Sequence, residues 1–171
     1  DVEEPTSAII FCKTKKGVDE LAEAMQTRGY HVEGMHGDMN QNQRMNTLRK
    51  FKEGSLEFLA ATDVASRGID VENISHVINY DFPQDIESYI HRIGRTGRAN
   101  KEGSAYSLVT AREYINLKQI ERMTGAKIQR KEIPTVDDIF QAKYRSLLND
   151  VKGTLEKEKF KRFVPLVTEI G

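Results

Sequence analysis

Short apolar runs alternate with amphipathic stretches along the first hundred residues of the chain. The apolar runs are typical of buried strands, and in the stretches between them apolar residues recur every three or four positions, as in helices with one buried face. The pattern predicts five strands, at Ala8–Cys12, Tyr30–Met35, Glu57–Ala61, His76–Tyr80 and Ala105–Val109. It predicts four helices, at Lys16–Arg28, Asn40–Lys52, Ile86–Ile93 and Ala111–Met123.

The alternation itself predicts the fold class. Strands that alternate with helices form a mostly parallel sheet with helices on both faces. Ligands of such sheets bind where the strands end and the loops begin. The polar segments of the chain lie at those places, at Lys13–Lys15, His36–Asp38, Thr62–Asp70 and His91–Arg98. Their position is the first indication of function.

The second predicted helix has a recognisable start and an apolar face. Asn40 and Gln43 have the spacing of a reciprocal cap, in which each side chain bonds the other's backbone. The helical period directs Met45, Leu48 and Phe51 toward the core.

After Pro134 the pattern is helical only. Thr135 is expected to cap a helix that ends near Gly153. Its apolar face consists of Phe140, Tyr144, Leu147, Leu148 and Val151. A second amphipathic stretch, interrupted by Pro165, carries Phe160, Phe163, Val164 and Val167. We therefore divide the chain into an α/β domain, residues 1–134, and a helical extension, residues 135–171. The extension either packs on its own domain or pairs with a second copy.

Composition narrows the classes of function. The 26 Lys and Arg residues balance the 26 Asp and Glu residues, so any nucleic-acid site is a local patch rather than a general polycation. The longest apolar run, Ala8–Cys12, is too short to span a membrane. One cysteine excludes an internal disulfide and fits a reducing compartment, so we expect a cytoplasmic protein. The chain starts at Asp1 without an initiator Met, and we expect a piece of a longer protein.

The segment His91–Arg98 carries the strongest chemical signal. Its three arginines recur every third residue, and glycine precedes both Arg95 and Arg98. Glycine inside a helix costs about 1 kcal/mol relative to alanine, so an ordinary basic helix end would avoid this pair. Glycine allows close backbone approach, and the planar arginine fork matches phosphate oxygens. The segment therefore favours a phosphate-binding site over a solvated basic helix.

Two further segments are compatible with phosphate and ribose binding, although each has a plainer interpretation. The Thr62 hydroxyl can bond a backbone phosphate and the Asp63 carboxylate can bond ribose hydroxyls, but both residue types also cap helices. The lysines of Lys13–Lys16 open a helix, where an anion is favoured, but a solvated lysine run has the same composition.

Other chemistries are not supported. The four histidines are scattered without ligand spacing, so no metal site is expected, and Cys12 is expected to be inert core. The sequence contains no Gly-x-x-x-x-Gly-Lys-Ser/Thr phosphate loop. The arginines therefore lack a nucleotide cradle of their own.

Residues 1–134 resemble the C-terminal, RecA-like lobe of a bacterial DEAD-box RNA helicase, because several sequence motifs of that lobe occur in the same order along the chain. The segments that resemble motif IV, the Gln-x-x-Arg element, motif V and motif VI are Ala8–Lys15, Gln41–Arg44, Ala61–Asp70 and His91–Arg98. His91 begins motif VI, where DEAH-type helicases have Gln. Ser66 departs from the Ala that is common in motif V.

The resemblance implies a RecA-like parallel sheet with helices on both faces, followed by the helical extension. It implies that ATP and Mg²⁺ are held mainly by an N-terminal lobe that this chain lacks, so that this chain alone is inactive. Arg95 and Arg98 would be arginine fingers, with Gly68 and Asp70 also at the ATP and with His91 and Arg92 linking the lobes. RNA would be bound along its backbone by Thr14, Lys15, Gly37, Arg44 and Thr62, and a short duplex would be opened locally.

The extension resembles, more loosely, the one that follows the core of cold-shock-type DEAD-box proteins, which implies a homodimer through residues 135–171. Two other readings of the chain stay open. One is a lobe of a DNA helicase or translocase, and the other is a non-catalytic RNA-binding or dimerisation module.

Overall fold

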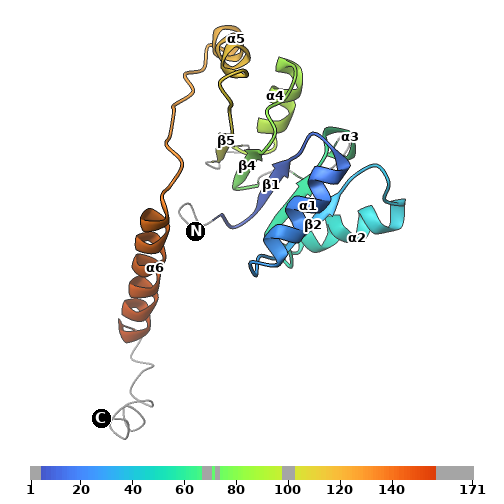
Figure 1. Cartoon of the computed structure of the whole chain (residues 1–171). Coiled ribbons are helices and arrows are strands. Elements are labelled where there is room, and N and C mark those ends of the chain that lie inside the picture. The colour runs from blue at the N-terminus through green and yellow to red at the C-terminus, as the bar shows by residue number, and fades with distance from the viewer. Residues whose placement is uncertain (1–4, 67–70, 72–73, 98–102, 157–171) are drawn as a thin grey trace, which may run out of the picture. The chain divides into compact units, whose positions relative to one another are not determined.

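The computed structural model describes residues 5–66, 71, 74–97 and 103–156 (Figure 1). These residues belong to two units, each described here by itself. The first unit, Pro5–Ile128, contains the sheet and five helices, and the second, which includes residues 129–171, contains one long helix. The predicted boundary at residue 134 lies in the segment that joins α5 (Tyr114–Thr124) to α6 (Val136–Glu156).

The first unit is built on a five-stranded sheet with the strand order β2-β3-β1-β4-β5, in which all four pairings are parallel. The strands, in chain order, are β1 (Ala8–Phe11), β2 (Val32–Met35), β3 (Phe58–Ala61), β4 (His76–Asn79) and β5 (Ser104–Ser107). Each of the five predicted strands overlaps an observed one, and the predicted α/β fold with a parallel sheet is confirmed.

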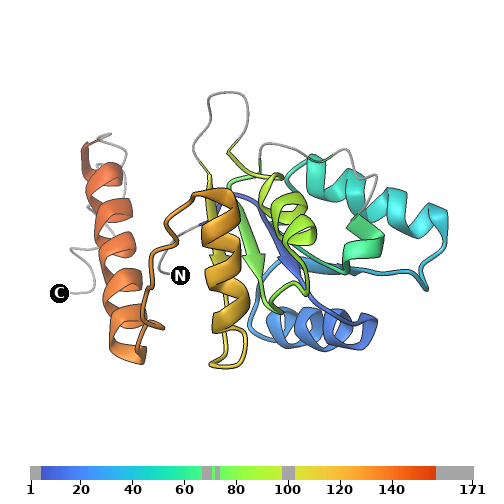
Figure 2. The ribbon, with the colours of Figure 1, turned by 90° about the horizontal axis from the view of Figure 1, so that it is seen from above.

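Helix α1 (Lys15–Gln26) covers one face of the sheet (Figure 2). Its buried residues Val18 and Ala22 pack against Ala8 and Ile10 of β1 and against the neighbouring strands. Gly34 in β2 permits this contact, because a Cβ there would lie 2.9 Å from a methyl carbon of Val18. The helix and the edge strand are therefore in close contact.

Helices α2 (Gln41–Lys52) and α3 (Asp63–Ser66) contribute to the core on the opposite face (Figure 2). There Phe51 and Ala65 join the alternate residues of the inner strands, among them Ile9 and Leu59. Farther along the chain, helices α4 (Ile86–Ile93) and α5 meet around Tyr89, Ile120 and Phe82 in a separate small core.

Several predicted details were wrong, each for its own reason. Met45 is 57% exposed, because Thr47 takes an inward position on α2 and bonds Glu33 of β2 at 2.6 Å. Helix α6 continues through Gly153 to Glu156, so this glycine does not end it. The one-turn helix α3 was not predicted, because four residues are too few to show a helical period.

The two predicted helix caps are confirmed, although α5 begins at Tyr114 rather than at Ala111. Asn40 and Gln43 form the reciprocal cap of α2, and each side-chain oxygen lies 2.9 Å from the other residue's backbone nitrogen. Thr135 caps α6 by accepting from the Asp138 amide, and the Asp138 carboxylate accepts from the Thr135 amide in return. The second apolar stripe, Phe160, Phe163, Val164 and Val167, lies outside the described residues.

None of the helices in the described part of the chain combines the length and the apolar character needed to cross a membrane.

The cap of α2 gives a direct test of this fold. Asn40→Ala should lower the free energy of unfolding by about 1 kcal/mol, because it leaves a backbone donor of the first helical turn without its partner. Urea denaturation measures the change. Asn42→Ala, on the exposed side of the same helix, should shift stability by less than about 0.5 kcal/mol. Equal losses in the two variants would show that the cap contributes nothing specific.

Candidate functional site

Polar residues that follow three neighbouring strands meet at one edge of the sheet. Because β2, β3 and β1 are parallel neighbours, their carboxyl ends lie side by side. Thr14 follows β1, Gly37 follows β2 and Thr62 follows β3. The Thr62 amide donates to the Met35 carbonyl at 3.3 Å, which joins the ends of β2 and β3 directly. The structure thus brings together segments that are up to 48 residues apart in sequence, between Thr14 and Thr62.

An ion pair joins the start of α1 to the turn after β2. The Lys15 ammonium lies 2.6 Å from the Asp38 carboxylate, and both side chains are largely exposed. The hydrogen bond to Lys15 lowers the pKa of Asp38, and the same bond raises the pKa of Lys15. A second contact on the same two elements joins Nε2 of His36 to Asp19 at 2.9 Å. Lys15 and Gly37 therefore lie on adjoining segments that are held together.

Two of the remaining polar groups of this edge contact α3, and a third caps α1. The Arg44 guanidinium donates to the Ala65 carbonyl at 2.9 Å, and the Thr62 hydroxyl accepts from the Ala65 amide at 3.4 Å. Thr14 caps α1 by accepting from the Gly17 amide at 3.0 Å. The edge thus presents two hydroxyls, an ammonium and a guanidinium, the groups that proteins use to hold phosphate and sugar.

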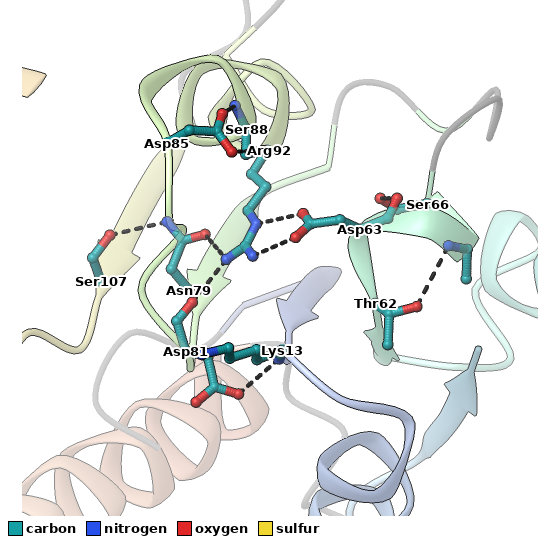
Figure 3. Close-up of polar contacts among 11 residues, drawn as sticks. Lys13, Thr62, Asp63, Ser66, Asn79, Asp81, Asp85, Ser88, Arg92 and Ser107 are labelled. Atoms are coloured by element: carbon teal, nitrogen blue, oxygen red, sulfur yellow. Dashed lines mark hydrogen bonds and ion pairs between the residues drawn. The ribbon is translucent and has the colours of Figure 1, made fainter. Parts of the chain in front are cut away.

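A buried arginine organises the other half of the site. Arg92 of α4 is only 3% exposed. Its Nε and Nη2 donate to the two carboxylate oxygens of Asp63, at 2.6 and 2.7 Å, as a two-pronged fork (Figure 3). Asp63 is the first residue of α3, so this ion pair fastens α3 to α4.

The strand register supplies the other partners of Arg92. Phe11, Asn79 and Ser107, the last residues of β1, β4 and β5, are in register, so they share one face of the sheet. Nη1 of Arg92 donates to Oδ1 of Asn79 at 3.1 Å and to the Asp81 carbonyl at 2.8 Å. The guanidinium carbon lies 5.0 Å from the centre of the Phe11 ring. The hydrogen bonds and the ion pair drawn in Figure 3 compensate the buried charge inside this chain.

The chain of hydrogen bonds continues beyond Asn79. Its amide nitrogen donates to the Ser107 hydroxyl at 2.9 Å, and Ser107 also bonds Tyr89. Burial raises the pKa of Tyr89. Pattern analysis did not single out Asn79 or Ser107. A polar amide inside an apolar strand was the available signal, because buried amides are almost always hydrogen-bonded.

A small pocket lies where α3 and α4 face each other. Its lining includes Asp63, Ser66, His91 and Arg95, and its volume is about 30 Å³. Pockets that enclose a small-molecule ligand measure about 300–1,000 Å³, so this one holds part of a ligand at most. His91 is exposed and Arg95 is half-buried at the pocket. Gly68, Asp70 and Arg98 lie outside the described residues.

The turn after α4 shows why glycine occupies position 97, next to Thr96. The Thr96 hydroxyl donates to the Ile74 carbonyl, which fixes the turn to the segment before β4. Gly97 has a φ of +68°, a left-handed conformation that favours glycine. A Cβ at Gly103 would lie 2.0 Å from the Thr96 hydroxyl oxygen, so glycine is required there as well.

Two expectations concern chemistry outside this site. Cys12 is fully buried, and burial raises its pKa to about 12, so the thiol stays protonated. Within the described ranges, no three His, Cys, Asp or Glu side chains are grouped closely enough to hold a metal ion.

Comparison with known proteins gives the context of this geometry. The model of the family described as "helicase conserved C-terminal domain" matches residues 1–100. The DEAD-box ATP-dependent RNA helicase CshA of Bacillus cereus is 49% identical over 170 residues, which are 99% of this chain and 32% of that protein. The chain therefore spans about a third of the length of this curated relative.

Solved structures agree with the sequence matches. The structure of the E. coli DEAD-box protein SrmB, bound to regulator of ribonuclease activity A, has a TM-score of 0.72 at 38% identity and covers 77% of each chain. A DEAD-box protein from Methanococcus jannaschii has a TM-score of 0.69 at 48% identity, covering 74% of this chain and 35% of that one. The chain belongs to the helicase conserved C-terminal domain family, with the RecA-like fold of the C-terminal domains of DEAD-box proteins.

Proposed function

We propose that this domain binds RNA along its sugar-phosphate backbone. The observation that carries the proposal is the convergence of Thr14, Lys15, Gly37, Arg44 and Thr62 at the carboxyl ends of three adjacent strands. These residues supply hydroxyl, cationic and exposed backbone groups, which hold phosphate and sugar without reading bases. In the complete protein this contact would serve local opening of an RNA duplex, and the protein would be cytoplasmic.

We propose further that the α3–α4 side of the domain completes an ATP site. ATP with its Mg²⁺ would be held mainly by an N-terminal lobe, for which the greater length of the curated relatives leaves room. Arg95 and Arg98 would act as arginine fingers that neutralise charge on the transferred phosphoryl group, with Gly68 and Asp70 also contacting ATP. The small size of the pocket beside Arg95 supports a site completed from two sides.

His91 and Arg92 are proposed to serve the junction between the lobes in different ways. His91 is exposed at the pocket and can contact the N-terminal lobe directly. Arg92 is engaged with Asp63, Asn79 and Asp81, so it would act by holding α3 and α4 in place. Hydrolysis of ATP would then belong to the complete protein, with this chain alone inactive.

A second role is proposed for residues 135–171, which would pair two copies of the chain. The supporting observation is an exposed apolar stripe on α6, made of Phe140, Tyr144, Leu147, Leu148 and Val151. A two-fold pairing would bury the same stripe from both copies.

The arginine fingers are tested by enzyme kinetics in the complete protein. Arg95→Ala or Arg98→Ala should lower ATP turnover by about 10³–10⁵-fold, because finger arginines stabilise charge that develops in the transition state. ATP affinity should change far less. Steady-state hydrolysis with saturating RNA and a nucleotide-binding titration measure the two quantities. A fall in affinity by the same factor as turnover would make the arginines ground-state binders.

Arg92→Ala provides the contrast. It should lower the free energy of unfolding by about 3 kcal/mol or more, because it leaves Asp63 and Asn79 without their buried partner. Arg95→Ala should lower the unfolding free energy much less, because Arg95 is only half-buried. Urea denaturation of the two variants separates the structural arginine from the proposed catalytic one.

The RNA assignment is tested through the salt dependence of binding. Arg44→Ala should weaken binding to all base sequences alike and flatten the log–log salt slope by about 0.7, the contribution of one phosphate contact on a single strand. Arg49→Ala is a matched control on the same helix, since Arg49 pairs with Glu53 at 3.0 Å. Loss of affinity for some base sequences only would show that Arg44 reads bases.

Pairing through α6 is tested by sedimentation over a concentration series. A dimer should appear with rising concentration, and Leu147→Asp should abolish it by placing a charge within the stripe. Asn149→Asp adds the same charge on the opposite side of the helix and should leave association unchanged. A wild-type chain that stays monomeric at its highest soluble concentration would reject the pairing.

A further inference from the structure

The Lys15 ammonium already pairs with a carboxylate of its own chain. Its ammonium lies 2.6 Å from Oδ2 of Asp38, and the two side chains are 62% and 61% exposed. The contact joins the start of α1 to the turn after β2. A phosphate can therefore reach the same ammonium from solvent, but it meets the carboxylate there.

Neighbouring charged groups favour the Lys15–Asp38 ion pair. Asp19, one helical turn along α1, also acts on Lys15, and both carboxylates raise its pKa. Asp19 is itself held by His36, two residues before Asp38. An ammonium has three donors and can contact two anions at once, but a phosphate and the Asp38 carboxylate on one ammonium would repel each other at close range. Binding of phosphate at Lys15 is therefore an exchange rather than an addition.

We propose that Asp38 is a built-in competitor for RNA phosphate, so that it sets the affinity and the salt dependence of the RNA contact at Lys15. The inference rests on the proposed RNA-binding function. In the free domain Asp38 replaces the mobile counterions that an isolated lysine would attract. RNA binding then breaks the Lys15–Asp38 pair and leaves the Asp38 carboxylate beside the phosphate, where it retains a cation that Lys15 alone would displace, so this contact releases fewer counterions.

A neighbouring ion pair provides a control of the same charge type. Lys16 and Glu20, also on α1, pair at 3.4 Å with side chains that are 82% and 65% exposed. Neither residue is among the groups assigned to RNA. Glu20→Gln removes one negative charge from the same helix, as Asp38→Asn does from the adjoining turn, but it releases a lysine outside the proposed contact.

The experiment measures binding of a short, fluorescently labelled oligouridylate to the full 171-residue chain by anisotropy at several salt concentrations. Asp38→Asn should tighten binding about two- to fivefold at low salt, the range expected when one exposed ion pair no longer competes. It should also steepen the log–log salt slope by up to about 0.7, because Lys15 then contributes a full phosphate contact. Glu20→Gln should change the slope much less.

The same substitution in a variant without Lys15 distinguishes competition for Lys15 from simple repulsion of RNA by Asp38. With Lys15→Met in place, Asp38→Asn should no longer tighten binding, because there is no ammonium to release. An equal gain with and without Lys15 would overturn the proposal, since Asp38 would then only repel RNA. Weaker binding by Asp38→Asn would also overturn it and make Asp38 a direct or positioning contact. Because both side chains are largely exposed, neither substitution should disturb the fold. Thermal melting of the variants checks this.

The same titrations distinguish this inference from the function on which it rests. RNA binding by the wild-type chain with no effect of Asp38→Asn would reject the competitor and leave the RNA assignment standing. Absence of binding by the wild type and the variant alike would reject the RNA assignment, and the competitor with it.

Discussion

The buried ion pair between Arg92 and Asp63 fixes the geometry on which the rest of the domain depends. A charge removed from water is tolerated only when nearby groups replace its hydration, and here a carboxylate, an amide oxygen and a carbonyl do so. Those groups come from the start of α3, from the end of β4 and from the residues after it. One side chain of α4 thus holds three segments in a single arrangement, because each would lose a partner if it moved.

The two proposed contact regions are adjacent to this pair. Thr62, at the edge proposed for RNA, directly precedes Asp63, and Arg95, proposed for ATP, follows Arg92 by one helical turn. A displacement of α3 that accompanied RNA contact would therefore act on the same ion pair that orients the end of α4. Asn79 and Ser107 extend the connection to β5, since the amide of Asn79 bonds both Arg92 and Ser107. The connection is physically continuous.

Much of this fold was predictable from periodicity, and the errors have separate causes. The five strands, the parallel sheet and the cap formed by Asn40 and Gln43 follow from local patterns that extend over several residues. Met45 was misplaced because Thr47, a polar residue, takes an inward position by bonding Glu33 on another strand. Gly153 was taken as a helix end because propensity alone does not show that the helix continues. The first of these errors could be avoided only with information from a distant strand.

The site was also predictable only in part. The sequence shows which residue types are present, but their partners come from segments that are distant in sequence. The sequence motifs pointed to Lys15, Arg44, Thr62 and Arg92, but none of them predicted the carboxylate, carbonyl or amide that each one meets. Those pairings depend on the strand order β2-β3-β1-β4-β5, which places the ends of distant segments together. The consequence is energetic as well as structural. Where a binding group already has a partner in the free domain, its contribution to ligand affinity is the free energy of the contact with the ligand minus that of the contact with the partner. The identity of the residue alone determines neither free energy.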